Sequence, residues 1–312
     1  MTRHAARCIR PPRPVLLIVG CGDVGLRVLR LLRGRWRVLA LTSSPERAPA
    51  LREAGAVPLV GNLDQPATLA RLAGLADAVL HLAPPPSQGP ADTRTAHLLR
   101  ALARRSGPRC VVYASTTGVY GDCGGALIDE TRPSAPATDR GRRRADAEAR
   151  LRWAGRAFGD GTLWRVSLLR VPGIYALDRE GGDPRERVRR GTPVLAAKDD
   201  VYTNHIHADD LARACVAALW RGAPQRAYHV SDDSDSKMGD HFDAVADRFG
   251  LPRPPRISRA EAGQQLSPAQ MSFLGESRRL SNRRLKRELR LELRYPTVAD
   301  GMGRALKSPA AA

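Results

Sequence analysis

A run of five apolar residues followed by a glycine-rich turn constrains the fold of this chain more than any other stretch. Residues 15–19 are typical of a strand buried on both faces, because helices cover both sides of a parallel sheet. Residues 20–25 spell G-x-G-x-x-G, and apolar residues then recur at helical spacing up to Leu32. This order predicts a dinucleotide-binding turn that holds phosphates on the free N–H groups of the helix N-terminus. The alternative is a glycine-rich turn that binds nothing.

The three glycines of this turn have separate physical functions in a dinucleotide site. Gly20 permits the tight turn, Gly22 lets a pyrophosphate approach the backbone, and Gly25 lets the helix pack closely on the strand. The whole turn is therefore predicted to contact the cofactor, namely Gly20, Cys21, Gly22, Asp23, Val24 and Gly25.

Strand and helix patterns alternate along most of the chain, which predicts a doubly wound parallel α/β sheet of the Rossmann type. Basic and C-terminal tails are expected at 1–13 and 304–312. Further strands are predicted at 37–42, 57–60, 77–82, 109–114, 164–170 and 228–230. Helices are predicted at 92–106, 140–157, 211–221 and 237–249, and a loop at 252–270.

The net charge of +19 is the unusual feature of the composition. Only four of the 51 basic residues are lysines, and aromatic residues make up 4% of the chain. A nucleic-acid surface usually interleaves basic and aromatic residues, so we do not expect a nucleic-acid partner. No apolar run approaches the ~20 residues of a membrane span. Five scattered cysteines without a C-x-x-C pair favour a reduced, cytoplasmic protein with no disulfide framework and no metal site.

The residues after the second predicted strand bear on the choice of cofactor. NAD enzymes usually place Asp or Glu there to bind the ribose 2′-OH, whereas this chain offers Ser43 and Arg47. Arg47 is able to pair with a 2′-phosphate, which favours NADP and leaves NAD possible. Ser44 can instead cap the following helix, and the two interpretations are compatible. Asp64 is expected to cap the helix that Pro66 opens.

Several further motifs resemble the extended short-chain dehydrogenase/reductase superfamily, specifically its NAD-dependent epimerase/dehydratase group. The likeness covers about residues 14–303. Its matches are GCGDVG at 20–25, Asp64, HLAP at 81–84, STTGVYG at 115–121, LRVPGIY at 169–175, NHIHADDLA at 204–212 and SNRRLKREL at 281–289. The resemblance implies that Asp64 reaches the adenine and that Ala83, with Pro84, lies along the cofactor. It also implies that the region after Tyr175 and the C-terminal part build a smaller C-terminal substrate lobe. We expect this lobe to comprise residues 173–199 and 231–303, and the dinucleotide-binding domain residues 14–172 and 200–230.

The chain departs from this family at the pair that handles the proton. The family uses Tyr-x-x-x-Lys beside a Ser or Thr, with a glutamate four residues past the lysine. Aligning that glutamate with Glu148 places Arg140 at the tyrosine position, Arg144 at the lysine position and Thr116 at the hydroxyl position. Deprotonating an arginine near neutral pH costs about 7 kcal/mol, so Arg140 cannot replace a tyrosine as acid–base. Two arginines one turn apart suit anion binding, and the alternative is that both are simply solvated.

Three functions remain open at this point. The first is an NADP-dependent reductase, epimerase or dehydratase of the atypical branch, which acts on a small anionic or carbonyl substrate similar to a sugar nucleotide. In that enzyme Thr116 orients the substrate oxygen, and Tyr120 and Tyr175 are candidate proton carriers. The second is an NAD(P)-binding sensor without turnover, and the third is a nucleic-acid binder. A homodimer or a monomer fits the first two.

Overall fold

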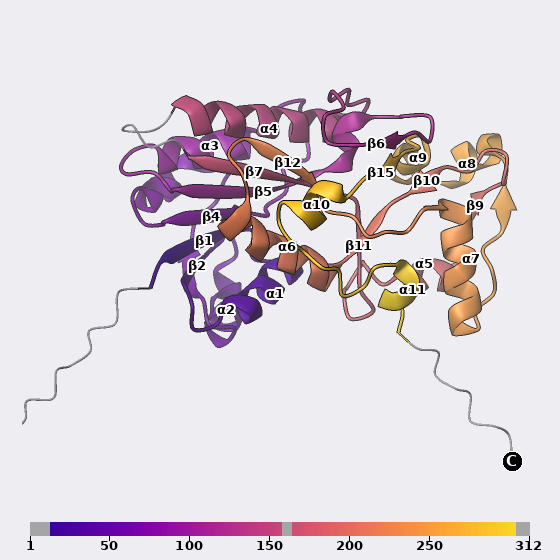
Figure 1. The fold of residues 1–312 in the computed structure, drawn as a ribbon, viewed down its shortest axis with the longest axis horizontal. Coiled ribbons are helices and arrows are strands. Elements are labelled where there is room, and N and C mark those ends of the chain that lie inside the picture. Colours follow the sequence, from indigo (N-terminus) through magenta and orange to yellow (C-terminus); the bar gives the residue numbers. More distant parts are fainter. Residues whose placement is uncertain (1–12, 158–163, 304–312) are drawn as a thin grey trace, which may run out of the picture.

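The computed structural model describes residues 13–157 and 164–303. A seven-stranded, wholly parallel sheet forms its centre, in the order β12-β7-β5-β4-β1-β2-β3 (Figure 1). The order reverses between β1 and β4, which is where open α/β sheets bind ligands. The strands of this sheet are β1 (Val15–Val19), β2 (Arg37–Thr42), β3 (Val57–Val60), β4 (Ala78–His81), β5 (Cys110–Thr116), β7 (Arg165–Val171) and β12 (Arg226–His229).

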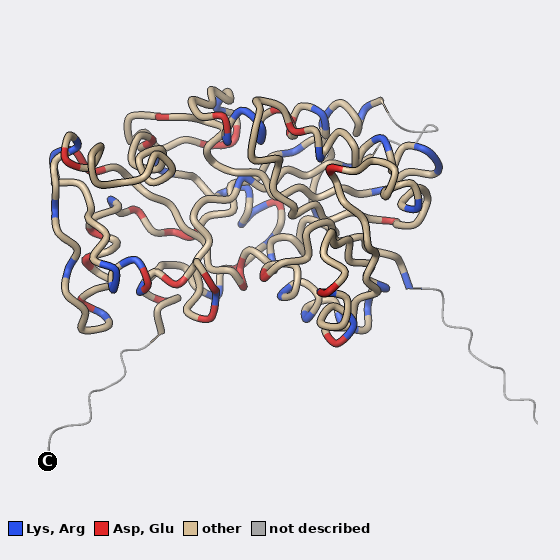
Figure 2. Tube along the Cα trace, turned by 180° about the vertical axis from the view of Figure 1, so that it is seen from behind, with Lys and Arg blue, Asp and Glu red and all other residues tan. Residues whose placement is uncertain are grey.

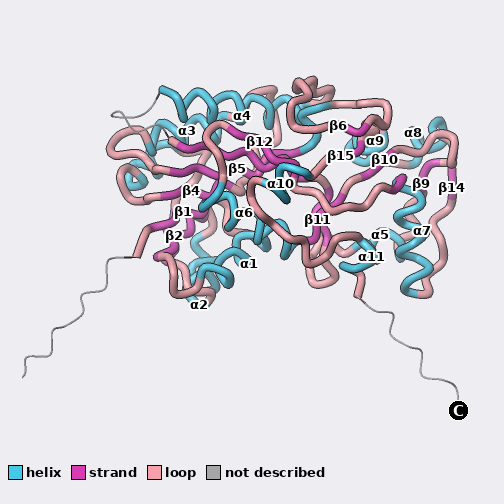
Figure 3. Tube along the Cα trace, in the orientation of Figure 1, coloured by secondary structure: helices cyan, strands magenta, loops and turns pink. Residues whose placement is uncertain are grey.

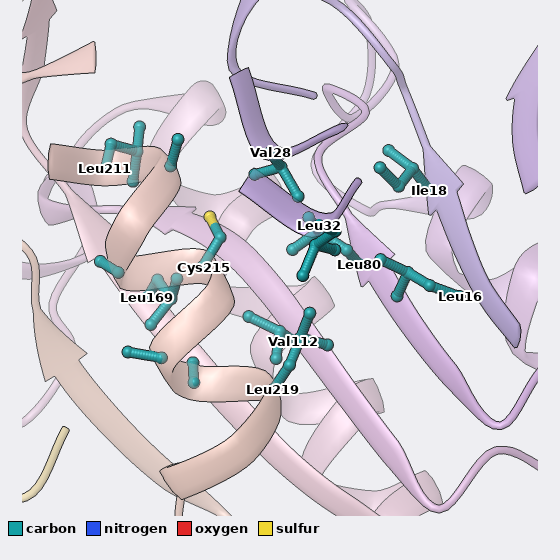
Figure 4. Close-up of a cluster of buried hydrophobic side chains, with 14 of the residues drawn as sticks. Leu16, Ile18, Val28, Leu32, Leu80, Val112, Leu169, Leu211, Cys215 and Leu219 are labelled. Atoms are coloured by element: carbon teal, nitrogen blue, oxygen red, sulfur yellow. The ribbon is translucent and has the colours of Figure 1, made fainter. Parts of the chain in front are cut away.

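Helices cover both faces of the sheet. Successive strand residues point to opposite faces, so apolar side chains on both faces need to be covered. One face carries α1 (Asp23–Leu32), α2 (Ala48–Glu53) and α6 (Ala208–Arg221), and the other carries η2 (Pro66–Leu72), α3 (Thr93–Leu102) and α4 (Asp139–Ala157). Figure 4 shows the first of these layers, in which Leu16, Ile18 and Leu80 of the sheet meet Val28 of α1 and Cys215 of α6.

Apart from η1, which follows β2 directly, and α10, which packs near β12, most of the remaining elements gather beyond the carboxyl ends of the strands, away from β2 and β3 (Figure 3). They enclose separate, smaller hydrophobic clusters, one of which contains Val188, Val245 and Met302. The elements are η1 (Pro45–Arg47), η3 (Thr117–Tyr120), β6 (Leu127–Ile128), β8 (Gly173–Tyr175), α5 (Pro184–Arg189), β9 (Val194–Leu195), β10 (Tyr202–Thr203), β11 (His205–His207), β13 (Ser236–Lys237), α7 (Met238–Phe249), β14 (Arg256–Ile257), α8 (Arg259–Gln265), α9 (Pro268–Leu274), β15 (Arg279–Leu280), α10 (Arg283–Arg287) and α11 (Val298–Gly301).

The structure confirms the expected fold class, and each predicted sheet strand forms within two residues of its expected bounds. The loop expected at 252–270 is wrong. Two helices, α8 and α9, form there, and each begins with a capping box, Ser258 with Glu261 and Ser267 with Gln270. These reciprocal bonds satisfy N–H groups that would otherwise lack partners, so they stabilise helices of only seven residues.

The expected cap of η2 is also wrong. Gln65 occupies the N-cap position and makes no side-chain capping bond, whereas the carboxylate of Asp64 accepts two hydrogen bonds from Arg94 of α3, at 2.8 and 2.6 Å. Ser44 likewise precedes η1 without a side-chain capping bond. Within residues 13–157 and 164–303, no helix is long and apolar enough to cross a membrane. The four described cysteines are free, and the tails expected at 1–13 and 304–312 lie outside the described residues except for Arg13.

Candidate dinucleotide and substrate site

Three cavities lie in a row along the carboxyl ends of the strands. The edge cavity, about 310 Å³, is lined by Gly20, Cys21, Ser43, Arg47, Asp64, Ala83, Pro84 and Arg94, among others. The turn cavity, about 290 Å³, is lined by Gly20, Gly22, Asp23, Val24, Gly25, Thr116, Arg144 and Arg179, among others. The lobe cavity, about 300 Å³, is lined by Thr116, Arg140, Arg179, Glu276 and Arg278, among others. The edge and turn cavities share Gly20 as a lining residue, and the turn and lobe cavities share Thr116, Pro172, Ile174 and Arg179.

The three glycines of the turn meet three different steric conditions. Gly20 has a φ of +85°, and a Cβ there would lie 2.5 Å from the backbone nitrogen of Ala83. A Cβ on Gly25 would contact Sγ of Cys21 at 3.0 Å, so this glycine sets the distance between α1 and β1. A Cβ on Gly22 meets nothing within 4 Å. Gly22 therefore leaves space in front of the N-terminus of α1, as a phosphate cradle requires.

Two arginines neutralise the carboxylate of Asp23 at the start of α1. Arg27, which is nearly buried, binds it at 3.1 Å, and Arg179 lies 3.2 Å from it. Arg27 also pairs with Asp178 at 2.7 Å and with Asp209 at 2.6 Å. These ion pairs join α1 to the segment after β8 and to the start of α6. They also offset a negative charge that would repel a phosphate bound at the turn.

The edge cavity contains two basic side chains and one acidic side chain. Arg47 reaches back to the glycine turn and donates a hydrogen bond to the carbonyl of Cys21 at 2.8 Å. Arg94 forms a two-pronged ion pair with Asp64, which lowers the pKa of that carboxyl chiefly through these hydrogen bonds. Asp64 is thus present as a paired carboxylate at the place where the sequence predicts a cofactor contact.

Arg144 of α4 is fixed against β5 in the turn cavity. Its guanidinium donates to the hydroxyl of Tyr113 at 2.9 Å and to the carbonyl of Ala114 at 2.7 Å. Thr116, at the end of β5, accepts a bond from the N–H of Gly118 at 3.3 Å. This contact uses a lone pair of the threonine oxygen and leaves its proton available to a bound molecule.

Arg140 lies one turn earlier on α4 and faces the lobe cavity. Its guanidinium stacks over the ring of Phe273 at 4.2 Å. Its side chain is half-buried, and burial lowers its pKa. Within the described part of the chain, no carboxylate lies within ion-pair distance of it. Arg140 and Arg144 are therefore not simply solvated, and in the RGRRR cluster only Arg142 is exposed.

A buried polar network lies behind the cavities. Arg170 of β7 binds Glu148 of α4 at 2.7 Å and the hydroxyl of Tyr120 at 2.6 Å, and His229 Nε2 lies 2.6 Å from the same hydroxyl. Burial raises the pKa of Tyr120 to about 12 and lowers that of His229 to about 3. Tyr120 lines none of the three cavities.

The structure brings together most of the residues that the sequence singled out, with two exceptions. Neither Tyr120 nor Tyr175 lines one of the three cavities. Tyr120 lies in the buried network, and Tyr175 donates its hydroxyl proton to the carbonyl of Thr297 at 3.2 Å. Sequence reasoning did not find Arg94, Tyr113, Arg179, Glu276 and Arg278. Arginine is so abundant in this chain that no local pattern separates these arginines from the rest. His81 is packed and bonded to Thr95 at 3.0 Å.

Comparison with protein-family models identifies the class of the chain. Residues 16–231 match the NAD dependent epimerase/dehydratase family, which confirms the resemblance found in the sequence, and the chain belongs to this family. A conserved protein of unknown function from Silicibacter pomeroyi is 30% identical, with a TM-score of 0.76 over 93% of this chain and 96% of the other.

Two neighbours with known activities share the fold at lower identity. A UDP-glucose 4-epimerase from Thermotoga maritima, solved with UDP-glucose, is 19% identical, with a TM-score of 0.74 over 93% of this chain and 97% of the other. A dTDP-glucose 4,6-dehydratase from Streptomyces venezuelae, solved with NAD, is 21% identical, with a TM-score of 0.73 over 93% and 95%. No curated protein matches the chain. In residues 13–157 and 164–303, no group of three or more side chains forms a potential metal site.

Proposed function

We propose that the protein is an NAD(P)-binding oxidoreductase or epimerase of the atypical short-chain dehydrogenase/reductase type, which acts on a carbonyl or hydroxyl group of a small anionic substrate. The observation that carries the proposal is the row of three connected cavities, which begins at the glycine turn and ends among unpaired polar groups of the lobe cavity. In this proposal, residues 14–172 and 200–230 bind the dinucleotide, and residues 173–199 and 231–303 enclose the substrate.

The residues of the first two cavities suit a nicotinamide dinucleotide. The open space at Gly22 and the N-terminus of α1 accommodate a pyrophosphate. Asp64, Ala83 and Pro84 line the place for the adenosine half, and Thr116 and Arg144 line the place for the nicotinamide half. When bound, the dinucleotide supplies or accepts a hydride.

NADP fits the edge cavity better than NAD does. Arg47 and Arg94 both line this cavity, but Arg94 is already paired with Asp64. Arg47 bonds only to a neutral carbonyl there, so its charge is available to a 2′-phosphate. Ser43 lies beside it and adds a hydroxyl donor at the same wall.

Arg140 and Arg144 occupy the positions at which the family has its tyrosine and lysine. We assign them to anion and ribose binding, because an arginine cannot release a proton near neutral pH. Arg144 is held by Tyr113 and Ala114 and presents a fixed hydrogen-bond donor to the turn cavity. Thr116 donates to the substrate oxygen, since its own proton is not used by the protein.

A second candidate function is a sensor that binds NAD(P) without turnover. It is favoured by the same two arginines, since neither is an acid–base group, and by the buried position of Tyr120. The two candidates share the dinucleotide site and differ only in hydride transfer.

Two measurements test these functions. Thermal unfolding with NADP or NAD should show stabilisation by either, with the larger shift for NADP, because a ligand that binds the native state stabilises it. Single-turnover loss of NADPH absorbance with a panel of carbonyl compounds then separates enzyme from sensor. Absence of any thermal shift contradicts both candidates. Intact binding without consumption of NADPH by any compound contradicts the enzyme.

The proposal also covers the binding partners, the cell compartment and the oligomeric state of the protein. Acidic and basic residues are interspersed along the whole trace (Figure 2), and many arginines are paired with carboxylates. This supports a protein that binds small anions rather than nucleic acid. The proposal also includes a cytoplasmic location and a homodimeric or monomeric state. A mobility shift with DNA or RNA that weakens as salt is added would contradict this assignment.

A further inference from the structure

Glu276 is the acidic side chain in the wall of the lobe cavity. It lies between α9 and β15, and its side chain is 6% exposed. One carboxylate oxygen, Oε2, accepts a hydrogen bond from Arg278 at 3.0 Å. The other oxygen, Oε1, is buried and has no hydrogen-bond partner in the protein.

A buried carboxylate oxygen without a hydrogen-bond partner destabilises the folded protein. The desolvation penalty is about 1–3 kcal/mol for an unpaired polar atom and more for a charged group. Native structures therefore seldom leave such an atom without a donor. The lobe cavity adjoins Glu276, so a molecule bound there is able to supply that donor. A carboxylate only accepts hydrogen bonds, so the donor belongs to the ligand.

The charges around Glu276 decide which kind of donor fits. Arg278 already neutralises Glu276, and Arg140 and Arg179 line the same cavity. An ammonium group would be repelled by these three arginines, whereas a neutral hydroxyl would not be. Among the described residues no carboxylate lies within ion-pair distance of Arg140, although the charge of Glu276 acts on it from farther away, so Arg140 remains available to an anionic group on the same ligand.

The size of the cavity limits the ligand. At about 300 Å³, it has nearly the volume of the turn cavity or of the edge cavity. Each of those two cavities is assigned one half of a dinucleotide in the proposed function. The lobe cavity accordingly holds a molecule no larger than a mononucleotide, and it lies at the lower end of the range for ligand sites.

We propose that Glu276 is a specificity-determining residue that accepts a hydrogen bond from a substrate hydroxyl while Arg140 binds the anionic group, so that the substrate is a small hydroxylated anion. This inference rests on the proposed function for its assignment of the other two cavities. It differs from that function in naming the residue that recognises the hydroxyl and in limiting the substrate to the size of a mononucleotide or less.

The test compares two phosphate monoesters of equal chain length, sorbitol 6-phosphate and hexyl phosphate, which differ in their hydroxyl groups. Isothermal titration calorimetry measures their binding to the full chain, with and without NADP. We expect the wild type to prefer sorbitol 6-phosphate by at least about tenfold, which corresponds to one good hydrogen bond to a charged group. Glu276→Gln should reduce this preference below about threefold, because the substituted amide is a weaker acceptor and also presents donors. The substitution also removes a negative charge beside Arg140 and Arg278, so both phosphates should bind more tightly and the ratio of the two affinities is the readout. Glu292→Gln changes an exposed glutamate and should retain the full preference.

Glu276→Asp is the second variant, for the case in which loss of the ion pair with Arg278 prevents folding. It keeps the charge but withdraws the oxygen from the cavity, so the preference should fall while the fold is kept. Equal binding of the two phosphates by the wild type overturns the proposal, as does an unchanged preference in both Glu276 variants. Tighter binding of UDP-glucose than of sorbitol 6-phosphate overturns the size limit. If NADP does not bind while the preference persists, the proposed function fails and the assignment of Glu276 stands.

Discussion

The buried ion pair between Glu148 and Arg170 anchors the helix that carries Arg140 and Arg144, and its removal gives the most direct test of the architecture. Glu148 lies one helical turn after Arg144 on α4, and Arg170 belongs to β7. Both side chains are 5% exposed. The perturbation is Glu148→Gln, which preserves the size of the side chain and removes its charge.

The magnitude depends on the contacts that are lost. The carboxylate accepts bonds from Nη2 and Nε of Arg170, at 2.7 and 3.1 Å, and from the hydroxyl of Ser115 at 2.6 Å. Removing one partner of a buried pair typically costs about 3–5 kcal/mol, because the other charge stays buried without compensation. The amide oxygen of glutamine still accepts one bond, and Tyr120 still contacts Arg170 at 2.6 Å. We therefore expect the lower end, about 3 kcal/mol of unfolding free energy.

Urea unfolding followed by tryptophan fluorescence measures this loss. Asp139→Asn is the matched control, since Asp139 pairs with Arg142 on the same helix, but these side chains are 65% and 51% exposed. An exposed pair contributes at most about 1 kcal/mol. Arg170→Met should lower the unfolding free energy less in the Glu148→Gln background than in the wild type, because the two residues interact directly.

The opposite pattern would refute this reasoning. If Glu148→Gln lowers the unfolding free energy by less than about 1 kcal/mol, or by no more than the control does, the pair is not an effective anchor. Additive effects of the Glu148 and Arg170 substitutions would lead to the same conclusion, since contacting residues in one network should show a coupling energy.

Three further predictions concern the cavities and the core. Gly22→Ala should leave stability nearly unchanged, since the residue has a φ of −86° and an added Cβ would meet open space. The same substitution should abolish the thermal shift with NADP, because the Cβ fills the space for a phosphate. A retained shift would contradict a phosphate at this turn. Arg47→Gln should weaken NADP binding several-fold and leave NAD binding unchanged in calorimetry, and equal losses would exclude a 2′-phosphate contact. Burial raises the pKa of Asp232 to about 7, so its protonated form is favoured in the folded state. The unfolding free energy of the wild type should therefore fall as the pH rises from about 4 to about 7. Asp232→Asn should remove this part of the pH dependence of urea unfolding, and an identical profile would contradict it.

The sheet could be predicted because its signals are local. Residues 15–19 and 38–41 are continuous apolar runs, and the glycine turn marks the end of the first strand and the start of α1. Each run is bounded by a turn or a helix pattern, so the alternation indicates a parallel sheet with helices on both faces, whereas the order of the strands is known only from the structure. The helices α8 and α9 also had a local signal, the Ser-x-x-Glu and Ser-x-x-Gln capping boxes at 258 and 267, which their short and weakly amphipathic sequences obscured.

The candidate site could be predicted only in part, because two of its walls come from opposite ends of the chain. The glycine turn and Thr116 come directly after strands and are recognisable by position. Glu276 and Arg278 reach the lobe cavity from a segment more than 150 residues after Thr116, and Arg278 is fixed there by the carbonyl of Gly121 at 2.8 Å. Nothing in the residues around Glu276 indicates this contact, since it depends on how the last part of the chain folds back.

The contacts of Arg140 and Arg144 favour separate functions for two residues that look equivalent in the sequence. Arg144 is bound to a buried tyrosine hydroxyl and a strand carbonyl, so its guanidinium has little freedom and presents a rigid donor to the turn cavity. The guanidinium of Arg140 stacks on the face of an aromatic ring, so its charge is compensated less and its position is more adaptable. A rigid donor suits a cofactor that is the same in every turnover, and an adaptable, partly desolvated cation suits the anion of a substrate that must enter and leave. The arginine pair therefore fits a site in which Arg144, at the position of the family's lysine, serves the cofactor and Arg140, at the position of its tyrosine, serves the substrate.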